Sequence, residues 1–319
     1  MKTPVWLKTL LADPSVTDIA LGAGRVSVDR GDGMRPEPAP WEEAELKTWL
    51  LAQLARSGKS WDARHPFVDA TLAENDEVAV AHRAHAIFPP VAPGGIEVTL
   101  RKLPRASRSK PVWGTSPYYA FLRDVVRRGE TLLISGSTGS GKTTLASELL
   151  SEVSPHERIV ALEDTRELAP AHPQFIPLLS RPPNADGFGE VSLRTLLKQT
   201  LRMRPDRIVL GECRGPEVLE LLQALKTGHR GTLATLHANS PREALRRIEL
   251  LGLLAAGNAV PLSALRELLA LGVQWIAQVE RAPEGRKIRE LVQVAGREGD
   301  TILLRPKVLA AGEPLKMIV

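Results

Sequence analysis

Residues 131–150 read TLLISGSTGSGKTTLASELL, a short apolar run followed by a glycine-rich turn and then by helix-forming residues. The turn matches the pattern G-x-x-x-x-G-K-[ST], in which glycines let successive backbone N–H groups point at phosphate oxygens. The N-terminus of the following helix adds a partial positive charge. This stretch therefore predicts a strand, a loop and a helix that bind a nucleoside triphosphate. The predicted binding residues are Gly136, Ser137, Thr138, Gly139, Ser140, Gly141, Lys142, Thr143 and Thr144.

The rest of the chain shows two different patterns. Beyond residue 113, apolar runs such as RIVALED, RIVLGE and GTLATLH alternate with helical stretches. This alternation predicts an α/β domain with a mostly parallel sheet and helices on both faces. The first hundred residues mix short strands and helices, which is typical of a smaller α+β domain. Residues 77–82 are interpreted as one of its strands, and residues 287–306 as a C-terminal hairpin.

A basic stretch separates the two patterns. RKLPRASRSKP, residues 101–111, contains five basic residues, two prolines and no acidic residue, which is the composition of a linker. We therefore predict an N-terminal domain at residues 1–100, a basic linker at 101–112 and the phosphate-binding domain at 113–319.

Two of the expected strands end in side chains suited to hydrolysis. Glu212 follows the run RIVL, so its carboxylate would emerge at the carboxyl edge of the sheet, beside the phosphate-binding loop. A carboxylate there can orient an attacking water and accept its proton. His237 ends the run GTLATLH, where its imidazole could contact the γ-phosphate. We predict that both residues are catalytic, together with Lys142, which reaches the β- and γ-phosphates.

Oxygen ligands for Mg²⁺ are available at the same edge. The Thr143 hydroxyl occupies the position that ligates Mg²⁺ in this kind of loop. Position 211, directly before Glu212, is glycine, so the metal must rely on Thr143, phosphates, water and other acids. Glu163 and Asp164 end another expected strand and supply such acids. The sequence therefore predicts ATP and Mg²⁺ as ligands, with Thr143 and Glu163 as metal ligands.

Composition sets broader limits. The 319 residues are 43% hydrophobic and 25% charged, as in soluble globular chains with a sizeable core. Cys213 is the only cysteine, which excludes an intrachain disulfide and an all-cysteine zinc site within one chain. The start of the chain has no signal-peptide pattern, and no apolar run reaches the ~18–20 residues that span a bilayer. We expect a cytoplasmic protein.

Together these stretches resemble one known family. GSTGSGKTTL, RIVALEDTREL and the run from LRMRPDRIVLGECRG through GTLATLHANSPREAL are similar to the Walker A, Asp box, Walker B and His box of the ATPase superfamily that powers type II and type IV secretion and type IV pili. HPFVDATL and IFPPVAPGGIEVTLRK resemble its N-terminal domain, so the resemblance covers residues 15–280. The chain is most similar to CpaF-type ATPases of tight-adherence pili and to type IV secretion traffic ATPases. The paired CxxC metal site of type II assembly ATPases is absent.

The resemblance implies a homohexameric ring whose RecA-like and N-terminal domains move against each other as ATP is hydrolysed. It implies a peripheral position at the cytoplasmic face of the inner membrane, with a polytopic platform protein as partner. Carried over by motif, Glu212 is the Walker B glutamate, Glu163 the Asp-box acid and His237 the His-box histidine. Arg101, in VTLRK, would approach the phosphates from the N-terminal side. The resemblance thus adds Glu163 and Arg101 to the predicted catalytic residues.

An arginine in that role also has a physical argument. Negative charge develops on the γ-phosphoryl oxygens during hydrolysis, and an arginine delivered only in a closed state accelerates the reaction by ~10³–10⁵. Arg101 and Arg105 lie in the basic stretch, between the two predicted domains. The rival candidates are Arg194, Arg202, Arg204 and Arg214.

Three alternatives to a motor ATPase remain open. A nucleic-acid translocase could use the same core, and the sequence pI of about 9.5 and the basic stretch motivate it, but that stretch has no interleaved aromatic residues to stack on bases. We therefore expect no nucleic-acid partner. A small-molecule phosphotransferase shares the strand–loop–helix start, and a nucleotide-gated scaffold would bind ATP with little turnover. The residues do not distinguish pilus assembly, pilus retraction, and protein or DNA secretion.

Overall fold

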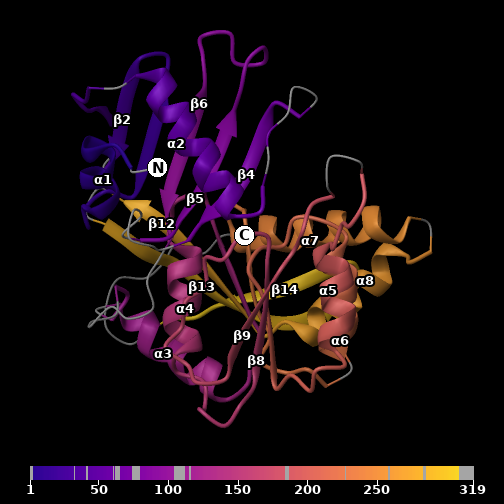
Figure 1. Ribbon diagram of the computed structural model, residues 1–319. Coiled ribbons are helices and arrows are strands. Elements are labelled where there is room, and N and C mark those ends of the chain that lie inside the picture. The colour runs from indigo at the N-terminus through magenta and orange to yellow at the C-terminus, as the bar shows by residue number, and fades with distance from the viewer. Residues whose placement is uncertain are drawn as a thin grey trace. The chain divides into compact units, whose positions relative to one another are not determined.

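The chain folds into two compact units, Met1–Arg105 and Ala106–Val319, whose elements are labelled in Figure 1. Much of the predicted linker, residues 104–111, lies outside the part of the chain that is described. The computed structural model describes residues 3–31, 33–40, 42–59, 61, 65–73, 80–103, 112–114, 116–183, 187–226, 228–257, 259–282 and 285–308.

Among its described residues, the first unit is an antiparallel sheet of order β3-β2-β1-β6-β5-β4 with two helices. Ala23 and Gly24, at φ 47° and 73°, form the tight turn between the first two strands. The strands are β1 (Asp18–Gly22), β2 (Arg25–Asp29), β3 (Met34–Pro36), β4 (Phe67–Leu72), β5 (His82–Ile87) and β6 (Glu97–Lys102), and the helices are α1 (Val5–Ala12) and α2 (Glu43–Arg56).

The strand predicted at residues 77–82 is wrong in position. β5 begins at His82, because there the chain pairs with Leu72 of β4 and with Lys102 of β6 at once. Residues 77–79 lie outside the described part of the chain. The alternating apolar residues that suggested the strand do not specify this register, which is set by the two neighbouring strands.

The core of the first unit forms where α2 covers one face of the sheet. Leu46, Trp49, Leu50 and Leu54 recur at helical spacing and are each at most 1% exposed. They pack in one cluster with alternate residues of the strands, such as Val98 of β6. Burial of this kind contributes about 1.5–3 kcal/mol for each large apolar side chain.

In the second unit, the described part of the chain forms an eight-stranded sheet of order β14-β13-β12-β7-β11-β10-β8-β9. All neighbouring pairs from β12 to β9 are parallel, and only the edge formed by β13 and β14 is antiparallel. The predictions of a mostly parallel sheet and a C-terminal hairpin are therefore confirmed. The strands are β7 (Leu132–Gly136), β8 (Ile159–Glu163), β9 (Phe175–Leu179), β10 (Arg207–Leu210), β11 (Leu233–Leu236), β12 (Trp275–Ala282), β13 (Gly285–Glu298) and β14 (Thr301–Pro306).

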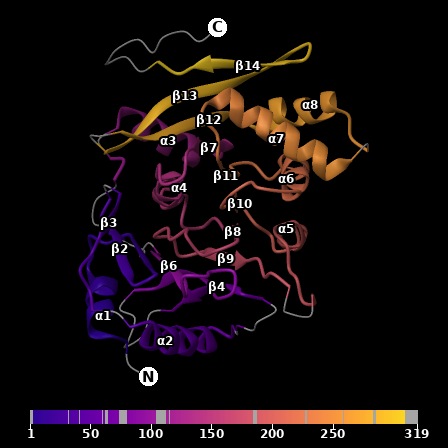
Figure 2. The ribbon, with the colours of Figure 1, turned by 90° about the horizontal axis from the view of Figure 1, so that it is seen from above.

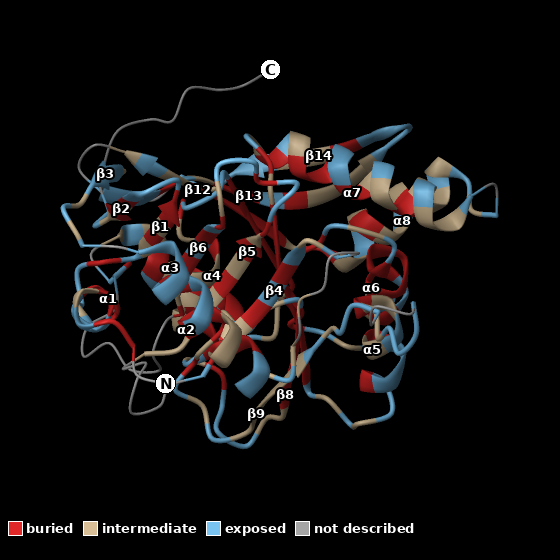
Figure 3. Cartoon of the chain, turned by 45° about the horizontal axis from the view of Figure 1, so that its top comes forward, coloured by how far each residue is buried: buried red, intermediate tan, exposed pale blue. Residues whose placement is uncertain are grey.

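Helices cover both faces of this sheet, as predicted. In Figure 2, α3 and α4 lie on one side of the strands and α5, α6 and α7 on the other. The two faces have separate cores: Leu133 of β7 packs with the second group of helices, and its neighbours Leu132 and Ile134 pack with the first. Buried residues are red in Figure 3, and every residue of β7, β8, β10 and β11 is buried. The helices are α3 (Pro117–Arg127), α4 (Lys142–Leu150), α5 (Leu193–Thr200), α6 (Glu217–Lys226), α7 (Pro241–Ala256) and α8 (Leu262–Gly272).

Because the central strands are parallel, their carboxyl ends meet at one edge of the sheet. β7 ends at Gly136 and β8 at Glu163, while β10 and β11 end at Leu210 and Leu236, just before Glu212 and His237. In open parallel sheets this edge is where ligands bind. The fold thus gathers the predicted site residues of the second unit at one edge.

Candidate nucleotide-binding site

The phosphate-binding loop has the backbone that its glycines predict. Gly139 and Gly141 have φ of 73° and 95°, values that residues with a Cβ rarely adopt. Gly136 is required for a different reason, since a Cβ there would lie 2.4 Å from the Val279 carbonyl oxygen of β12. A Cβ at Gly141 would lie 2.8 Å from Cδ of Arg286. The loop is therefore closely packed against the β12–β13 hairpin.

Lys142 is buried beneath this loop. Its side chain is 6% exposed, and its Nζ donates hydrogen bonds of 2.9 Å to the carbonyl oxygens of Gly136 and Ser137. Burial lowers the pKa of the Lys142 ammonium to about 8, while the nearby carboxylates of Glu212 and Glu167 raise it. An anion next to Nζ would oppose this effect of burial, so the lysine is placed to favour a negatively charged ligand.

His237 connects Lys142 to Glu212. Its Nδ1 lies 3.4 Å from Lys142 Nζ, and its Nε2 lies 3.1 Å from Glu212 Oε1. An ammonium can only donate, so Nδ1 accepts and the ring proton sits on Nε2, facing the carboxylate. Burial and then the Lys142 ammonium lower the pKa of His237 below its ordinary value. The imidazole is therefore a neutral link between a cation and an anion.

Glu212 is fixed from a second side by an arginine. Arg214 Nη2 lies 2.5 Å from Glu212 Oε2, while its Nη1 lies 3.9 Å from Asp164 Oδ2. The Glu212 side chain remains 20% exposed, so water can reach it. The residue that the sequence placed beside the phosphate loop is thus an oriented carboxylate with access to solvent.

Glu163 differs from Glu212 in burial. It is 3% exposed, and its Oε1 accepts hydrogen bonds from the backbone N–H groups of Glu167 and Leu168, at 2.9 and 2.8 Å. Burial raises the pKa of the Glu163 carboxyl to about 7, against the lowering effect of these two hydrogen bonds. A Cβ at Gly211 would lie 2.8 Å from Glu163 Cγ, so the glycine before Glu212 makes room for this buried acid.

Sequence reasoning missed Glu167. Its Oε2 lies 3.2 Å from the Thr143 hydroxyl, which places a carboxylate directly beside the predicted magnesium ligand. The stretch EDTREL contained the signal, because a third acidic residue follows soon after Glu163 and Asp164. Asp164 itself accepts a hydrogen bond of 2.7 Å from the Ser180 hydroxyl.

The oxygen atoms at this edge fit Mg²⁺ shared with a nucleotide. Among the described residues, no group of three or more His, Cys, Asp or Glu side chains could hold a metal ion. Magnesium in nucleotide sites needs fewer, because phosphates and waters complete its shell around one or two protein oxygens. The Thr143 hydroxyl, the Glu167 carboxylate and the buried, unpaired Oε2 of Glu163 are oxygens of the kind it prefers.

The candidate arginines lie in different settings. Arg194 Nε is 2.6 Å from Glu220 Oε1, and Arg214 is held by Glu212. Arg202 and Arg204 are exposed between α5 and β10. Arg101 belongs to the first unit, where its Nε donates to Asp18 Oδ1 at 2.7 Å, and Arg105 lies outside the described residues. The part that each plays toward phosphate stays a prediction.

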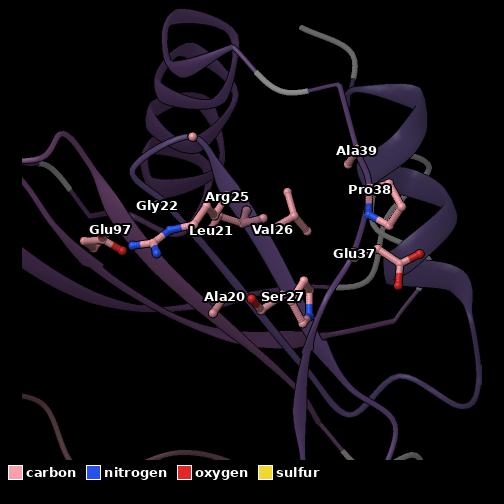
Figure 4. A pocket seen from close by; sticks show the side chains of 12 residues that line it. Ala20, Leu21, Gly22, Arg25, Val26, Ser27, Glu37, Pro38, Ala39 and Glu97 are labelled. Carbon is pink, nitrogen blue, oxygen red and sulfur yellow. The ribbon is translucent and has the colours of Figure 1, made fainter.

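A cavity of about 750 Å³ lies elsewhere, in the first unit. β1, β2 and the segment at residues 36–39 line it, and Figure 4 shows Arg25 and Glu97 pointing toward one another at one end. None of the predicted nucleotide-binding residues lines it. No helix among the described residues is long and apolar enough to cross a bilayer.

Comparisons with known proteins show the family to which this chain belongs. Residues 59–279 match the family described as Type II/IV secretion system protein. A Mycobacterium tuberculosis protein named for conjugal transfer is 40% identical over 296 residues, 91% of this chain and 83% of that protein. The crystal structure of the VirB11 ATPase from the Brucella suis type IV secretion system is 27% identical, with a TM-score of 0.50 and coverage of 90% of this chain and 92% of that one.

A further likeness concerns the fold alone. The ATPase DotB of Legionella pneumophila is 19% identical, covers 89% of this chain and 79% of its own, and gives a TM-score of 0.64. The family match spans well over half of the chain, with part of the first unit and most of the second. The resemblance drawn from the four motifs is therefore confirmed, and the chain belongs to the type II/IV secretion system protein family.

Proposed function

We propose that this chain is a motor ATPase that hydrolyses Mg-ATP at residues 136–144 to drive a type II/IV secretion or pilus machine. The observation that carries the proposal is the series Lys142–His237–Glu212, with contacts of 3.4 and 3.1 Å between successive side chains. A phosphate-binding ammonium, a neutral imidazole and a solvent-accessible carboxylate in series suit the attack of water on a phosphoanhydride. Family membership supports the same class of reaction.

Binding would begin with an exchange of partners at Lys142. Its Nζ would leave the carbonyl oxygens of Gly136 and Ser137 for phosphate oxygens, whose negative charge keeps the ammonium protonated at neutral pH. The backbone N–H groups of the loop and the start of α4 would hold the remaining phosphate charge. When Lys142 turns toward the phosphates, its contact with Nδ1 of His237 changes, so His237 would register an occupied site.

Hydrolysis would then use Glu212 as the base. Its carboxylate accepts a proton from water as the water oxygen bonds to the γ-phosphorus and the bond to the β-phosphate oxygen breaks. Arg214 and His237 hold the carboxylate in place. Mg²⁺, when bound with ATP, would neutralise charge on the β- and γ-phosphates. Thr143, Glu163 and Glu167 are the residues that would hold it, directly or through water.

The assembled form belongs to the same proposal. We infer a homohexamer at the cytoplasmic face of the inner membrane, coupled to a polytopic platform protein, with Arg101 approaching the nucleotide from the N-terminal side. Support comes from the family and from the relative named for conjugal transfer. Pilus assembly, as in the tight-adherence systems, and export of protein or DNA are both compatible with such a motor.

Two measurements on the purified chain test the proposal. Phosphate release from Mg-ATP without any added acceptor should be readily detected, and the solution mass should rise to six copies with ATP and Mg²⁺. Release that requires an acceptor would favour a phosphotransferase. Tight ATP binding without turnover would favour a scaffold, and a persistent monomer would contradict the ring.

The same phosphate-release assay also tests for a nucleic-acid partner. Turnover is measured with and without single- and double-stranded DNA over a range of salt concentrations. A motor that acts on a protein platform should respond little. A strong stimulation with a steep salt dependence would instead identify a nucleic-acid translocase.

A further inference from the structure

Gln278 is a polar side chain in an otherwise apolar part of β12. It is 4% exposed, and its neighbours Ala277 and Val279 are fully buried. An aliphatic side chain could be buried at this position without cost. Burial of a primary amide is energetically unfavourable unless its polar atoms are hydrogen-bonded. The amide therefore needs a local explanation.

Both polar atoms of Gln278 are bonded to the candidate site. Its Oε1 accepts from the Ser135 hydroxyl at 2.5 Å, and its Nε2 donates to the Ala238 carbonyl oxygen at 3.0 Å. A carbonyl only accepts, so the amide nitrogen must face Ala238 and the oxygen must face Ser135. Ser135 directly precedes the first glycine of the phosphate loop, and Ala238 directly follows His237.

The strand register explains how one side chain reaches both segments. Gln278 of β12 is level with Ser135 of β7, which in turn is level with Leu236 of β11. The amide thus extends from β12 across β7 to the chain just beyond the end of β11. β12 and β11 are not neighbours in the sheet, so the backbone ladder does not join them directly.

The segment that Gln278 reaches is the one that aligns His237. β11 ends at Leu236, so His237 and Ala238 lie beyond the strand. The position of the imidazole between Lys142 and Glu212 depends on the backbone at these two residues. On the basis of the proposed function, we propose that Gln278 is a positioning residue, whose amide holds His237 in register with the phosphate loop for ATP hydrolysis.

Steady-state kinetics of three variants tests this assignment. Gln278→Met keeps length and removes both hydrogen bonds, and Gln278→Glu keeps the acceptor for Ser135 but places an oxygen against the Ala238 carbonyl. Both should lower kcat for ATP by about tenfold or more, the scale of losing a buried hydrogen bond. Ser135→Ala, the matched control, removes the hydroxyl that bonds to Gln278 and to the Ala277 carbonyl oxygen but keeps the Ala238 contact, so it should lower kcat by less than about threefold.

ADP affinity and folding separate positioning from general damage. ADP contacts the loop without a γ-phosphate, so its affinity should stay within about twofold of the wild type in each variant. Thermal unfolding identifies any variant that fails to fold, and the other Gln278 substitution then carries the test. An equal loss of ADP affinity and kcat in a folded variant would overturn the assignment.

A double-substitution cycle asks whether Gln278 acts through His237. If it does, Gln278→Met should change kcat by no more than about twofold in a His237→Gln background. Independent, multiplying effects of the two substitutions would overturn the proposal.

An NMR measurement keeps this inference separate from the proposed function. The ring nitrogen signals of His237, assigned by comparison with His237→Gln, should report a neutral Nε2–H tautomer in the wild type. In Gln278→Met they should move toward a mixture of tautomers, and unchanged signals would overturn the inference. This readout needs no turnover, so a wild-type chain that releases no phosphate would contradict the proposed ATPase and leave the positioning test decisive.

Discussion

The charged side chains at the two ends of strand β10 differ in burial and in access to water. At its amino end, Arg207 is almost fully buried and forms two contacts with Glu157, at 2.5 and 3.1 Å. Its guanidinium fills the space beside Gly231, where a Cβ would lie 1.7 Å from Nη1. Just beyond the carboxyl end, Glu212 belongs to a series of side chains that remains open to water.

This difference distinguishes a charged side chain that stabilises the fold from charged side chains that are suited to binding and catalysis. A bidentate ion pair provides the buried arginine with a fixed partner of opposite charge. At the carboxyl end, burial disfavours the charged forms of nearby groups, lowering the pKa of Lys142 to about 8 and raising that of Glu163 to about 7. Sites that bind and transform a ligand typically contain several groups whose pKa values are shifted toward 7. Here such groups lie together at one edge of the sheet.

Lys142→Ala should give the largest effect. The substitution removes the ammonium from beneath the loop, and we expect ATP turnover to fall by about 10³-fold or more, as for groups at which transition-state charge develops. Turnover and nucleotide affinity are measured on protein whose unfolding temperature is close to that of the wild type. Near-normal activity would mean that the phosphate site is misassigned.

Glu212→Gln should separate binding from hydrolysis. The amide keeps the shape of the side chain but cannot accept a proton, so turnover should fall by about 10²–10³-fold. ATP affinity, measured by titration with a fluorescent nucleotide, should be preserved. A variant that still turns over normally would make Glu163 the better candidate for the base.

Arg207→Met should show the opposite pattern. Arg207 is buried but Glu157 is partly exposed, so the substitution loses two charged hydrogen bonds and leaves a partly solvated carboxylate, which should lower the free energy of unfolding by about 2–3 kcal/mol. Turnover of the folded fraction should change little, because Arg207 lies at the other end of the strand. Glu157→Gln in the same background should restore part of the loss, since it removes the unpaired charge. A drop in kcat without a drop in stability would contradict a purely structural role.

Local sequence determines the parts of the site that were predicted. The glycines, Lys142 and Thr143 are consecutive, so their arrangement follows from a short pattern. Apolar runs also indicated that Glu163, Glu212 and His237 end strands, and the parallel sheet then brings those ends together.

Contacts across the sheet could not be predicted in the same way. His237 meets Lys142 across 95 residues, and Gln278 meets Ser135 across 143. These contacts depend on the strand order, which periodicity does not specify. Burial is also a tertiary property: Glu163 and Glu212 both follow apolar runs, yet only Glu163 is sealed from solvent. α8 and β12 were not predicted, although Pro261 directly precedes α8 and Gly272 is its last residue, shortly before β12.

Glu163→Gln should give the smallest effect on stability, and one that depends on pH. The pKa of Glu163 is about 7 in the folded chain against 4.5 for the free side chain, so the folded state holds a proton that the unfolded chain releases. Stability should therefore fall as pH rises from about 4.5 through 7 in the wild type. Glutamine carries no charge at any pH and keeps an acceptor for the N–H groups of Glu167 and Leu168. Relative to the wild type, the variant should gain about 2 kcal/mol in free energy of unfolding between pH 5 and pH 8, measured with urea.

A control variant isolates the ionisation from the hydrogen bonds. Glu163→Ala loses the acceptor for both N–H groups, so it should be less stable than Glu163→Gln at each pH. Its stability relative to the wild type should nevertheless rise over the same pH range, since it too lacks the buried carboxyl. A pH-independent difference between the wild type and Glu163→Gln would mean that this carboxyl ionises freely. Burial would then not disfavour the charged form of Glu163. At the carboxyl ends of the strands, burial would shift the pKa values of Lys142 and His237 but not that of Glu163.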